Sequence, residues 1–300
     1  MMDWIERMNG AMSYIEENLA AEIDFKTAAA IACCSVYHFQ RMFSFITEIP
    51  LSEYIRRRRL TLAAADLQNN DIKIINLALK YGYDSPVSFT RAFQKMHGIT
   101  PSLARATGAR LKAYPRLSFH ISLRGDKEMN YKIIEKDGFE VVGKSMRVST
   151  VNEAQLKIIP RFWDKAERDG TVGTLADIAA NGADGQTNRK LLGICTDFSD
   201  NNEFSYVIAV ENTAKGEYAG FEVFHIPPAD WGIFEATGPM PEAIQELFKR
   251  IYTEFFPAGG YERAEGPDLE IYYEGDMASP DYRSEIWIPV VKRALSGIKG

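Results

Sequence analysis

Residues 35–46 carry side chains of the kinds that recognise the edges of base pairs. Phe39 and Phe43 lie four residues apart, which predicts that they share the buried face of a helix. On the other side of this helix we expect Tyr37, Gln40, Arg41 and Ser44. Arginine can donate two hydrogen bonds to guanine, and glutamine can pair with adenine in a similar way. The pattern therefore suits a DNA major groove, although an ordinary solvated helix face has the same composition.

The same features recur fifty residues later. Each copy predicts a short helix, a tight turn capped by serine and a second helix, the order of a helix-turn-helix unit. In the second copy the matching surface consists of Val87, Ser88 and Arg91, and Arg91 can contact either a base or a phosphate. Ser85 is the predicted cap and also a candidate contact to the DNA backbone. The repeat rests on these identities: Ala28 and Ala78, Ser35 and Ser85, Phe39 and Phe89, Arg41 and Arg91, Phe43 and Phe93, Ile49 and Ile99, and Ser52 and Ser102.

A long helix predicted from Leu51 to Leu67 connects the two units. Its length of about 25 Å makes it a plausible spacer for two recognition helices in major grooves about 34 Å apart. Arg56 to Arg59 form a run that spans most of the helix circumference, so these side chains cannot all face DNA. We expect some of them, including Arg57, to contact phosphates and at least one to pair with a carboxylate. Other helices are expected over 4–19, 25–33, 72–80 and 86–96, with a short turn from Pro101.

The distribution of charge, together with the change from helical to strand patterns, divides the chain into two domains. Residues 1–125 hold 16 Lys and Arg against 11 Asp and Glu, a net charge of +5, whereas the remainder holds 19 against 30, a net charge of −11. A basic half joined to an acidic half indicates one domain that contacts the phosphates of a nucleic acid and another domain with a different kind of partner. We therefore predict a DNA-binding domain over 1–112, a linker over 113–128 and a second domain over 129–300.

The second domain is predicted to be α+β. Short strands are expected over 139–148, 191–196, 204–210, 221–226, 231–236, 269–273 and 285–288, and helices over 158–168 and 241–255. Because the order strand, helix, strands occurs twice, this domain is a candidate duplication. In its last strand Glu285, Trp287 and Pro289 alternate with three apolar residues. From the residues alone, the Glu-and-Trp face can be either solvated or part of a binding site.

Several classes of function lack support in the sequence. The four histidines are scattered, Cys33 and Cys34 are adjacent, and Cys195 stands apart, so neither a metal site nor a disulfide framework is expected. The segment 138–145 has the glycine, lysine and serine spacing of a phosphate-binding loop, but its interior is typical of a strand. The sequence also shows no apolar run long enough for a membrane helix and no signal region. We expect a cytoplasmic protein without a cofactor.

The N-terminal residues resemble the AraC/XylS family of transcription regulators, and within it the MarA/SoxS/Rob group. The likeness covers about residues 5–106 and departs at Glu48, where the family usually has glycine. It implies base-edge roles for Tyr37, Gln40 and Arg41, sequence-specific binding to double-stranded DNA, and an activator that works with RNA polymerase. The matching segments are 35–43, 54–56, 59–60, 81–85, 89–93 and 98–102.

The second half resembles GyrI-like effector-binding domains, through residues 159–163, 204–206, 221–223, 226–231, 270–272 and 285–289. The resemblance implies two repeated strand-helix-strand-strand units around a central pocket for a bulky, aromatic or cationic small molecule. It also implies a pocket glutamate at Glu285, because a carboxylate beside aromatic rings attracts a lipophilic cation. Candidate walls are Trp287, Trp231, Trp163 and Tyr273. The alternatives are a GyrI-like hydrolase fused to a DNA-binding domain and a protein-interaction module; fusion to two DNA-reading units favours a sensor that is not an enzyme.

Overall fold

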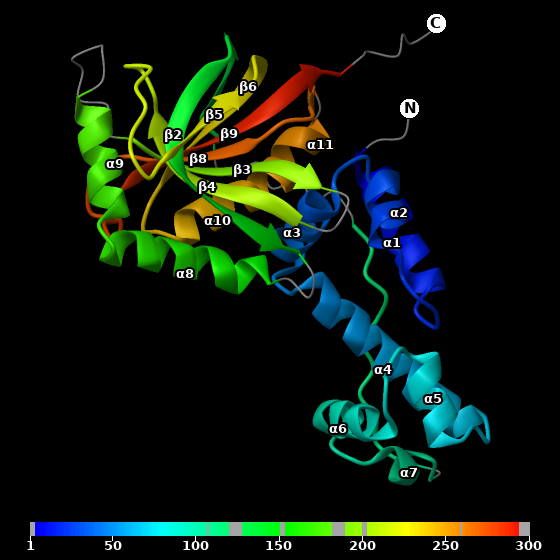
Figure 1. The fold of residues 1–300 in the computed structure, drawn as a ribbon. Coiled ribbons are helices and arrows are strands. Elements are labelled where there is room, and N and C mark those ends of the chain that lie inside the picture. The colour runs from blue at the N-terminus through cyan, green and yellow to red at the C-terminus, as the bar shows by residue number, and fades with distance from the viewer. Residues whose placement is uncertain are drawn as a thin grey trace, which may run out of the picture. The chain divides into compact units, whose positions relative to one another are not determined.

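The computed structural model describes residues 4–106, 108–119, 128–150, 154–181, 190–199, 203–258 and 260–293. The chain separates into two units, residues 2–120 and residues 121–300, and each is described by itself. The first unit is helical and the second combines a large antiparallel sheet with helices (Figure 1). This order of an all-α domain and an α+β domain is the predicted one.

The helical unit contains the two predicted helix-turn-helix units. The repeat is retained in three dimensions, because α3 and α6 have the same length and begin at positions fifty residues apart. The long helix α4 connects the two units and measures roughly 28 Å. The helices of this unit are α1 (Trp4–Glu17), α2 (Phe25–Ile31), α3 (Val36–Thr47), α4 (Leu51–Asn69), α5 (Ile74–Lys80), α6 (Pro86–His97) and α7 (Pro101–Ala104).

Matching caps begin and end the second helix of each unit. The hydroxyl oxygens of Ser35 and Ser85 accept hydrogen bonds from the backbone N–H groups of His38 and Ser88, at 3.3 and 3.1 Å. At the other end, Glu48 and Gly98 occupy corresponding positions and both adopt the left-handed conformation, with φ of 59° and 82°. The first unit thus keeps the family's turn with a glutamate where the second unit has the glycine that this conformation favours.

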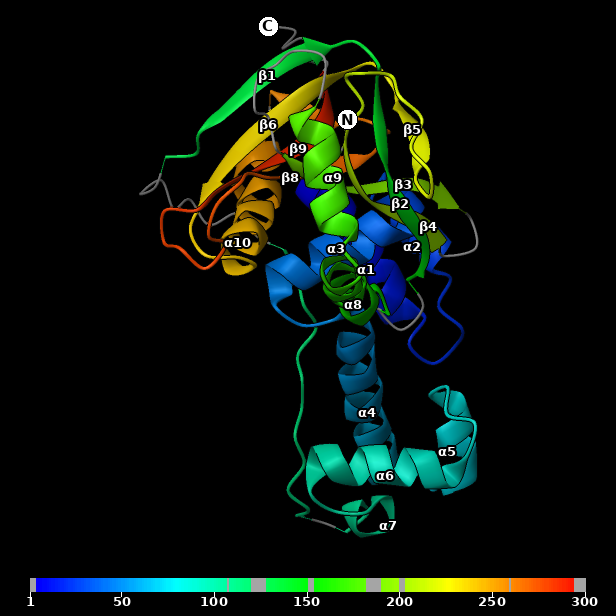
Figure 2. The ribbon, with the colours of Figure 1, turned by 60° about the vertical axis from the view of Figure 1, so that its left-hand side comes forward.

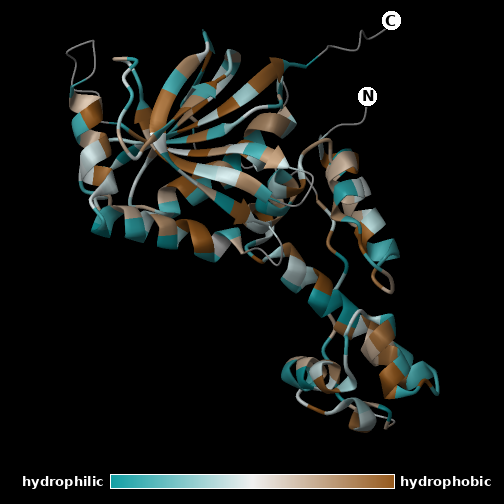
Figure 3. Ribbon diagram, in the orientation of Figure 1, coloured by the Kyte–Doolittle hydropathy of each residue, from teal (hydrophilic) through white to brown (hydrophobic). Residues whose placement is uncertain are grey.

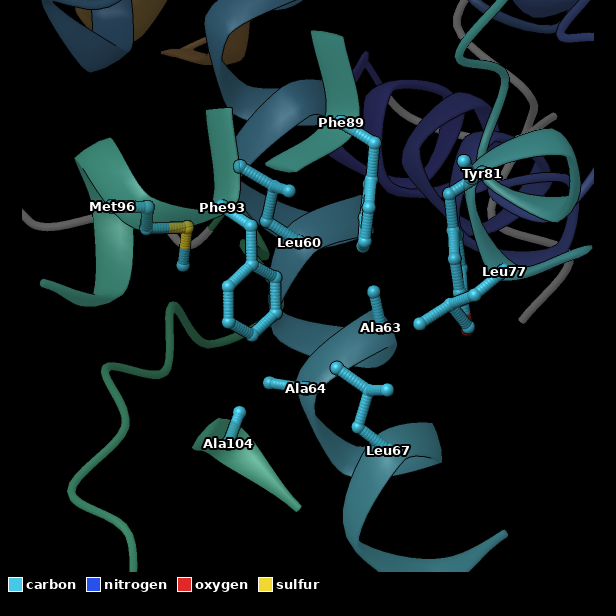
Figure 4. Packing of buried hydrophobic residues seen from close by; sticks show 11 residues of the cluster. Leu60, Ala63, Ala64, Leu67, Leu77, Tyr81, Phe89, Phe93, Met96 and Ala104 are labelled. Carbon is cyan, nitrogen blue, oxygen red and sulfur yellow. The ribbon is translucent and has the colours of Figure 1, made fainter. Parts of the chain in front are cut away.

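Aromatic residues of α6 and small residues of α4 form the core of the second unit. Phe89 and Phe93 are fully buried and lie 5.7 Å apart between ring centroids. They pack against Leu60, Ala63 and neighbouring residues of α4, as Figure 4 shows. Because α4 is shared by both helix-turn-helix units, this core fixes where α6 stands on the helical unit.

All four arginines of the run in α4 are held within the helical unit. Arg56 and Arg57 pair with Glu53, and Arg58 pairs with Glu16 of α1. Arg59 donates to the backbone carbonyls of Leu19 and Ala21. The expectation that at least one arginine pairs with a carboxylate is correct, and three of them do. Arg57 also lies over the Tyr114 ring at 4.9 Å, so its role as a phosphate contact requires that it leave these partners.

The first part of the predicted linker packs against the helical unit. Tyr114 N–H donates to Thr61, and Leu117 N–H donates to the Tyr54 hydroxyl. Phe119 exchanges two hydrogen bonds with the Asn9 amide and is buried. Residues 113–119 therefore extend the helical unit beyond residue 112, because they satisfy polar groups of α1 and α4 that the sequence pattern did not reveal. Residues 120–127 of the predicted linker lie outside the described residues.

His97 connects the end of α6 to this extension. Its ring lies within hydrogen-bonding distance of the Leu60 carbonyl through Nε2, at 3.2 Å, and Nδ1 accepts from the Lys112 N–H, at 3.2 Å. Both contacts are satisfied together when Nε2 carries the proton and Nδ1 does not. Burial lowers the pKa of His97, and the nearby Lys112 charge acts in the same direction.

We expect acid to destabilise the helical unit through His97. Because folding lowers its pKa, the unfolded chain binds a proton first, so this contribution is complete above about pH 6.5 and is lost as the pH falls below that value. Melting temperatures measured between pH 7.5 and 5.5 should fall less steeply for His97→Gln than for the parent protein. An identical pH dependence in the two proteins would mean that His97 contributes nothing.

The second unit is built on an antiparallel sheet in the order β1-β6-β9-β8-β3-β4-β2-β5, with β7 paired to β9. Figure 3 shows hydrophobic and hydrophilic residues alternating along its strands. The seven predicted strands are all present, and β1 and β7 are additional. The strands are β1 (Tyr131–Lys136), β2 (Phe139–Ser149), β3 (Leu191–Ser199), β4 (Glu203–Glu211), β5 (Glu222–Ile226), β6 (Ala229–Thr237), β7 (Tyr261–Arg263), β8 (Asp268–Tyr272) and β9 (Arg283–Lys292).

The strand order supports an internal duplication. If β1, β2, β3 and β4 are matched with β5, β6, β8 and β9, the order of the eight main strands reads the same from either edge. Each half therefore consists of two strands, a helical segment and two strands, and its first strand pairs with the other half. This exchange pairs β1 with β6, which lies about a hundred residues away in the sequence.

The helices of the second unit lie on one face of the sheet (Figure 2). Trp163 of α8 packs against Tyr272, and Phe255 packs against Phe234. We call this the helix face, and the opposite side the core face, which is built around Trp231, Leu269 and Ile271. The helices are α8 (Gln155–Arg168), α9 (Thr171–Ala180), α10 (Glu242–Arg250), the π-helix η2 (Ile251–Phe255) and α11 (Phe256–Ala258).

Candidate nucleic-acid interface and effector site

The second recognition helix, α6, presents one polar surface to solvent. Val87, Ser88 and Arg91 are exposed, as the sequence predicts, and Val87 is 60% exposed. Gln94 and Lys95 lie one helical turn further on and are exposed as well. The sequence analysis omitted these two residues, although their spacing of three and four from Arg91 places them on the same face. Ser85 is half-buried at the start of the helix, where its hydroxyl is the N-cap.

The first recognition helix, α3, differs from the predicted solvated face. Tyr37 and Gln40 are buried in the structure, and Arg41 and Ser44 are half-buried. Arg41 donates a 2.8 Å hydrogen bond to the Tyr37 hydroxyl, and its guanidinium lies over the rings of Tyr37 and Phe45. Arg41 therefore covers Tyr37, which a helical wheel that places residues only by angle does not anticipate.

The five predicted effector residues fall on opposite faces of the sheet. Glu285 and Trp287 are paired with residues 271 and 269, which belong to the core face together with Trp231 and Tyr273. Trp163 comes from α8 and packs on the helix face. Side chains alternate between the two faces of a strand, so the core face and the helix face are opposite sides of the sheet. Trp163 therefore cannot line one site with the other four residues.

Glu285 is buried, and its hydrogen bonds come from neighbouring aromatic residues. The Tyr273 hydroxyl donates to Oε1 at 2.8 Å, and Trp287 Nε1–H donates to Oε2 at 2.7 Å. Burial raises the pKa of Tyr273, and its hydrogen bond to Glu285 raises it further. The rings beside this carboxylate are already approached by cations: Lys190 lies 4.7 Å from the Tyr273 ring and Lys136 lies 5.7 Å from the Trp287 ring. A ligand cation would meet both ammonium groups here.

A second buried carboxylate, Glu270, lies on the helix face. Oε2 accepts a 2.8 Å hydrogen bond from the Tyr272 hydroxyl, and the Tyr206 hydroxyl lies at 3.4 Å. Trp163 Nε1–H donates to the same Tyr206 hydroxyl at 2.8 Å, and the Trp163 ring stands edge-on to Tyr272 at 5.3 Å. The group therefore joins one carboxylate with three aromatic rings from α8, β4 and β8. Glu270 and Tyr206 were quoted for the GyrI resemblance but were not predicted as site residues.

Gly193 leaves the space in which this group assembles. A Cβ atom at this position would come within 2.4 Å of the Tyr206 hydroxyl and 3.2 Å of Glu270 Oε2. Any larger residue at position 193 would therefore push the tyrosine and the carboxylate away from their present positions. The group depends on four segments that lie far apart in the sequence, which is why no single motif revealed it.

Comparisons with known proteins agree with this two-part architecture. Residues 132–290 match the family of integron-associated effector-binding proteins, and residues 28–107 match a helix-turn-helix domain. The transcriptional activator AarP of Providencia stuartii is 42% identical over 92 residues, which are 31% of this chain and 68% of AarP. The chain belongs to the AraC-type transcription regulators. It also belongs to the integron-associated effector-binding family, so it is a DNA-binding regulator with an effector-binding domain.

Two further relatives of this regulator extend the comparison. The Right origin-binding protein of Escherichia coli K12 is 25% identical over 301 residues, covering 96% of this chain and 99% of that protein. The solved structure of SAV2435 bound to tetraphenylphosphonium is 26% identical and covers 54% of this chain and 94% of that one, with a TM-score of 0.45. The first of these relatives aligns with both domains of the regulator.

Among the described residues, no cluster of His, Cys, Asp and Glu is suited to a metal ion. No helix of the described residues is long and apolar enough to cross a membrane. The three cysteines are free thiols, and Cys33 occupies the tight turn before α3 with a positive φ of 55°.

DNA binding by the regulator should depend on Arg91. Its removal deletes an exposed cation from α6, and a lost base contact costs about 1–3 kcal/mol. If Arg91 contacts a phosphate, affinity should fall equally on all sequences and depend less steeply on salt. Titration of labelled duplexes at two salt concentrations distinguishes these cases. Arg105→Ala is a matched control, because that residue is bound to the backbone of residues 70–72; an equal loss in both variants would argue against a specific role for Arg91.

Proposed function

We propose that this regulator is a transcription activator whose effector-binding domain holds a lipophilic cation at Glu270 on the helix face of the sheet. The observation that carries the proposal is a buried carboxylate surrounded by Trp163, Tyr206 and Tyr272. Aromatic ring faces and a carboxylate together favour an organic cation over a neutral or anionic ligand. At Glu285, by contrast, Lys136 and Lys190 already occupy positions over the neighbouring rings.

The DNA contacts belong to the same proposal. Val87, Ser88 and Arg91 of α6 read one major groove. Arg41 and Ser44 of α3 read the next one along the duplex, and Tyr37 and Gln40 join them when these buried side chains become exposed. Ser85 and Arg57 contact the backbone, Arg57 by exchanging its Glu53 partner for a phosphate. The activator relative AarP supports positive control, and we propose RNA polymerase as the protein partner. We further propose that the domain senses its ligand without turnover, which predicts recovery of the ligand unchanged after incubation.

Replacement of Glu270 by glutamine tests the effector site. Glu270→Gln preserves shape and removes the charge, so affinity for tetraphenylphosphonium should fall by about 2 kcal/mol, roughly thirtyfold. Calorimetric titration of the full chain measures this change. Glu246→Gln is a suitable control because it removes an exposed carboxylate from α10 of the same unit. Equal binding by Glu270→Gln and the parent protein would contradict the assignment, and a loss confined to Glu285→Gln would move the site to the core face.

A further inference from the structure

The end of β8 connects the two buried carboxylates across the sheet. Tyr272 is the last residue of the strand and donates to Glu270 on the helix face. Tyr273 is the next residue and donates to Glu285 on the core face. Consecutive side chains of an extended segment point to opposite faces. The tyrosine that donates to Glu270 and the tyrosine that donates to Glu285 are therefore neighbours in the chain, and their side chains lie on opposite faces of the sheet.

Beyond Tyr272, side-chain hydrogen bonds replace the ladder of the sheet. The β8–β9 register ends with Tyr272 opposite Ser284. Two hydrogen bonds then fix Tyr273. Its hydroxyl donates to Glu285, and the hydroxyl of the buried Tyr282 donates to the Tyr273 backbone carbonyl, at 2.8 Å in each case. Trp287 in turn orients Glu285. Tyr272 is itself paired on both sides, with Leu191 of β3 and Ser284 of β9, so the bonds of Tyr273 fix the chain at the point where it leaves the sheet.

We infer that Glu285 is a positioning residue for the effector site rather than a group that contacts the effector. It holds Tyr273 on the core face and thereby sets the direction of the Tyr272 hydroxyl, which orients the Glu270 carboxylate. This inference rests on the proposed function of Glu270. It also gives a role to the one carboxylate that the sequence singled out and that the effector site does not use.

A double-mutant cycle with tetraphenylphosphonium as the probe tests the inference. Tyr273→Phe removes the hydroxyl and keeps the ring and backbone, so we expect affinity to fall roughly three- to tenfold, the effect of one neutral hydrogen bond. Glu285→Gln should cause a loss of similar size. The NH2 group of the glutamine amide cannot accept a hydrogen bond, so either the Tyr273 hydroxyl or Trp287 Nε1–H would lose its acceptor. In a Glu270→Gln background neither change should have any further effect, because the carboxylate they position is gone.

The outcomes separate the possible roles. Additive losses for Glu270→Gln and Glu285→Gln would overturn the inference and make Glu285 a second anchoring charge. A loss from Tyr273→Phe that persists in the Glu270→Gln background would indicate general loosening of the sheet and would also overturn it. Full affinity in Tyr273→Phe and Glu285→Gln, with a loss in Glu270→Gln, would overturn the inference but leave the proposed function intact. Full affinity in Glu270→Gln would refute the proposed function itself.

Discussion

Arg58→Ala should destabilise the helical unit by about 3–5 kcal/mol. Arg58 and Glu16 are 12% and 8% exposed, and the guanidinium donates to both carboxylate oxygens and to the Tyr114 carbonyl. Burial by itself raises the pKa of Glu16, but hydrogen bonds from Arg58 and Tyr54 outweigh it and keep the pKa below its ordinary value. Without Arg58, the buried negative charge of Glu16 loses its partner. The hydrogen bonds that connect α4 to α1 and to the extension at Tyr114 are lost with it.

The same run of arginines supplies the control. Arg56 pairs with Glu53 on the surface of α4, and its side chain is 35% exposed. Exposed pairs of this kind contribute about 0–1 kcal/mol, so Arg56→Ala should unfold at nearly the denaturant concentration of the parent protein. Chemical denaturation followed by circular dichroism measures both variants. Similar losses from the two substitutions would show that burial of the Arg58 pair is unimportant.

Phe93→Ala should destabilise the second helix-turn-helix unit by about 3–5 kcal/mol. The side chain is fully buried, and its ring lies 5.7 Å from Phe89 and 4.2 Å from His97 between centroids. Truncation leaves a cavity between α6 and α4, and the helix that carries Arg91 loses its fixed position. We therefore expect specific DNA binding to be lost together with stability.

Ile75→Ala on α5 tests whether the effect depends on burial. Ile75 is 51% exposed, and its truncation should change the free energy of unfolding by less than about 0.5 kcal/mol. Duplex titration and thermal melting of both variants measure the effects. Retained DNA affinity in Phe93→Ala would mean that the second unit is not needed for recognition.

The sequence by itself determined the elements with local signals. Serine caps, four-residue aromatic spacing and a repeat of fifty residues place α3 and α6 correctly, because helix formation and capping depend on residues within one or two turns. Seven of the nine strands described in the second unit were predicted in the same way, from alternation, and β1 and β7 were not. The likeness to AraC-type regulators and to GyrI-like domains also rested on contiguous segments, and the family comparisons confirm both.

Tertiary structure alone decided which side chains meet. Alternation shows that Glu285 and Trp287 share a face, but only the pairing of β8 with β9 and the position of α8 show that Trp163 lies on the other one. The sequence pattern of residues 113–119 is that of a linker because their partners are distant in the sequence: Thr61 is 53 positions from Tyr114, and Asn9 is 110 positions from Phe119. The Glu270 group was missed for the same reason: Trp163, Gly193, Tyr206 and Glu270 come from four separate segments. Hydrogen bonds and burial across such distances leave no periodic trace in the sequence, since they depend on how the sheet orders its strands.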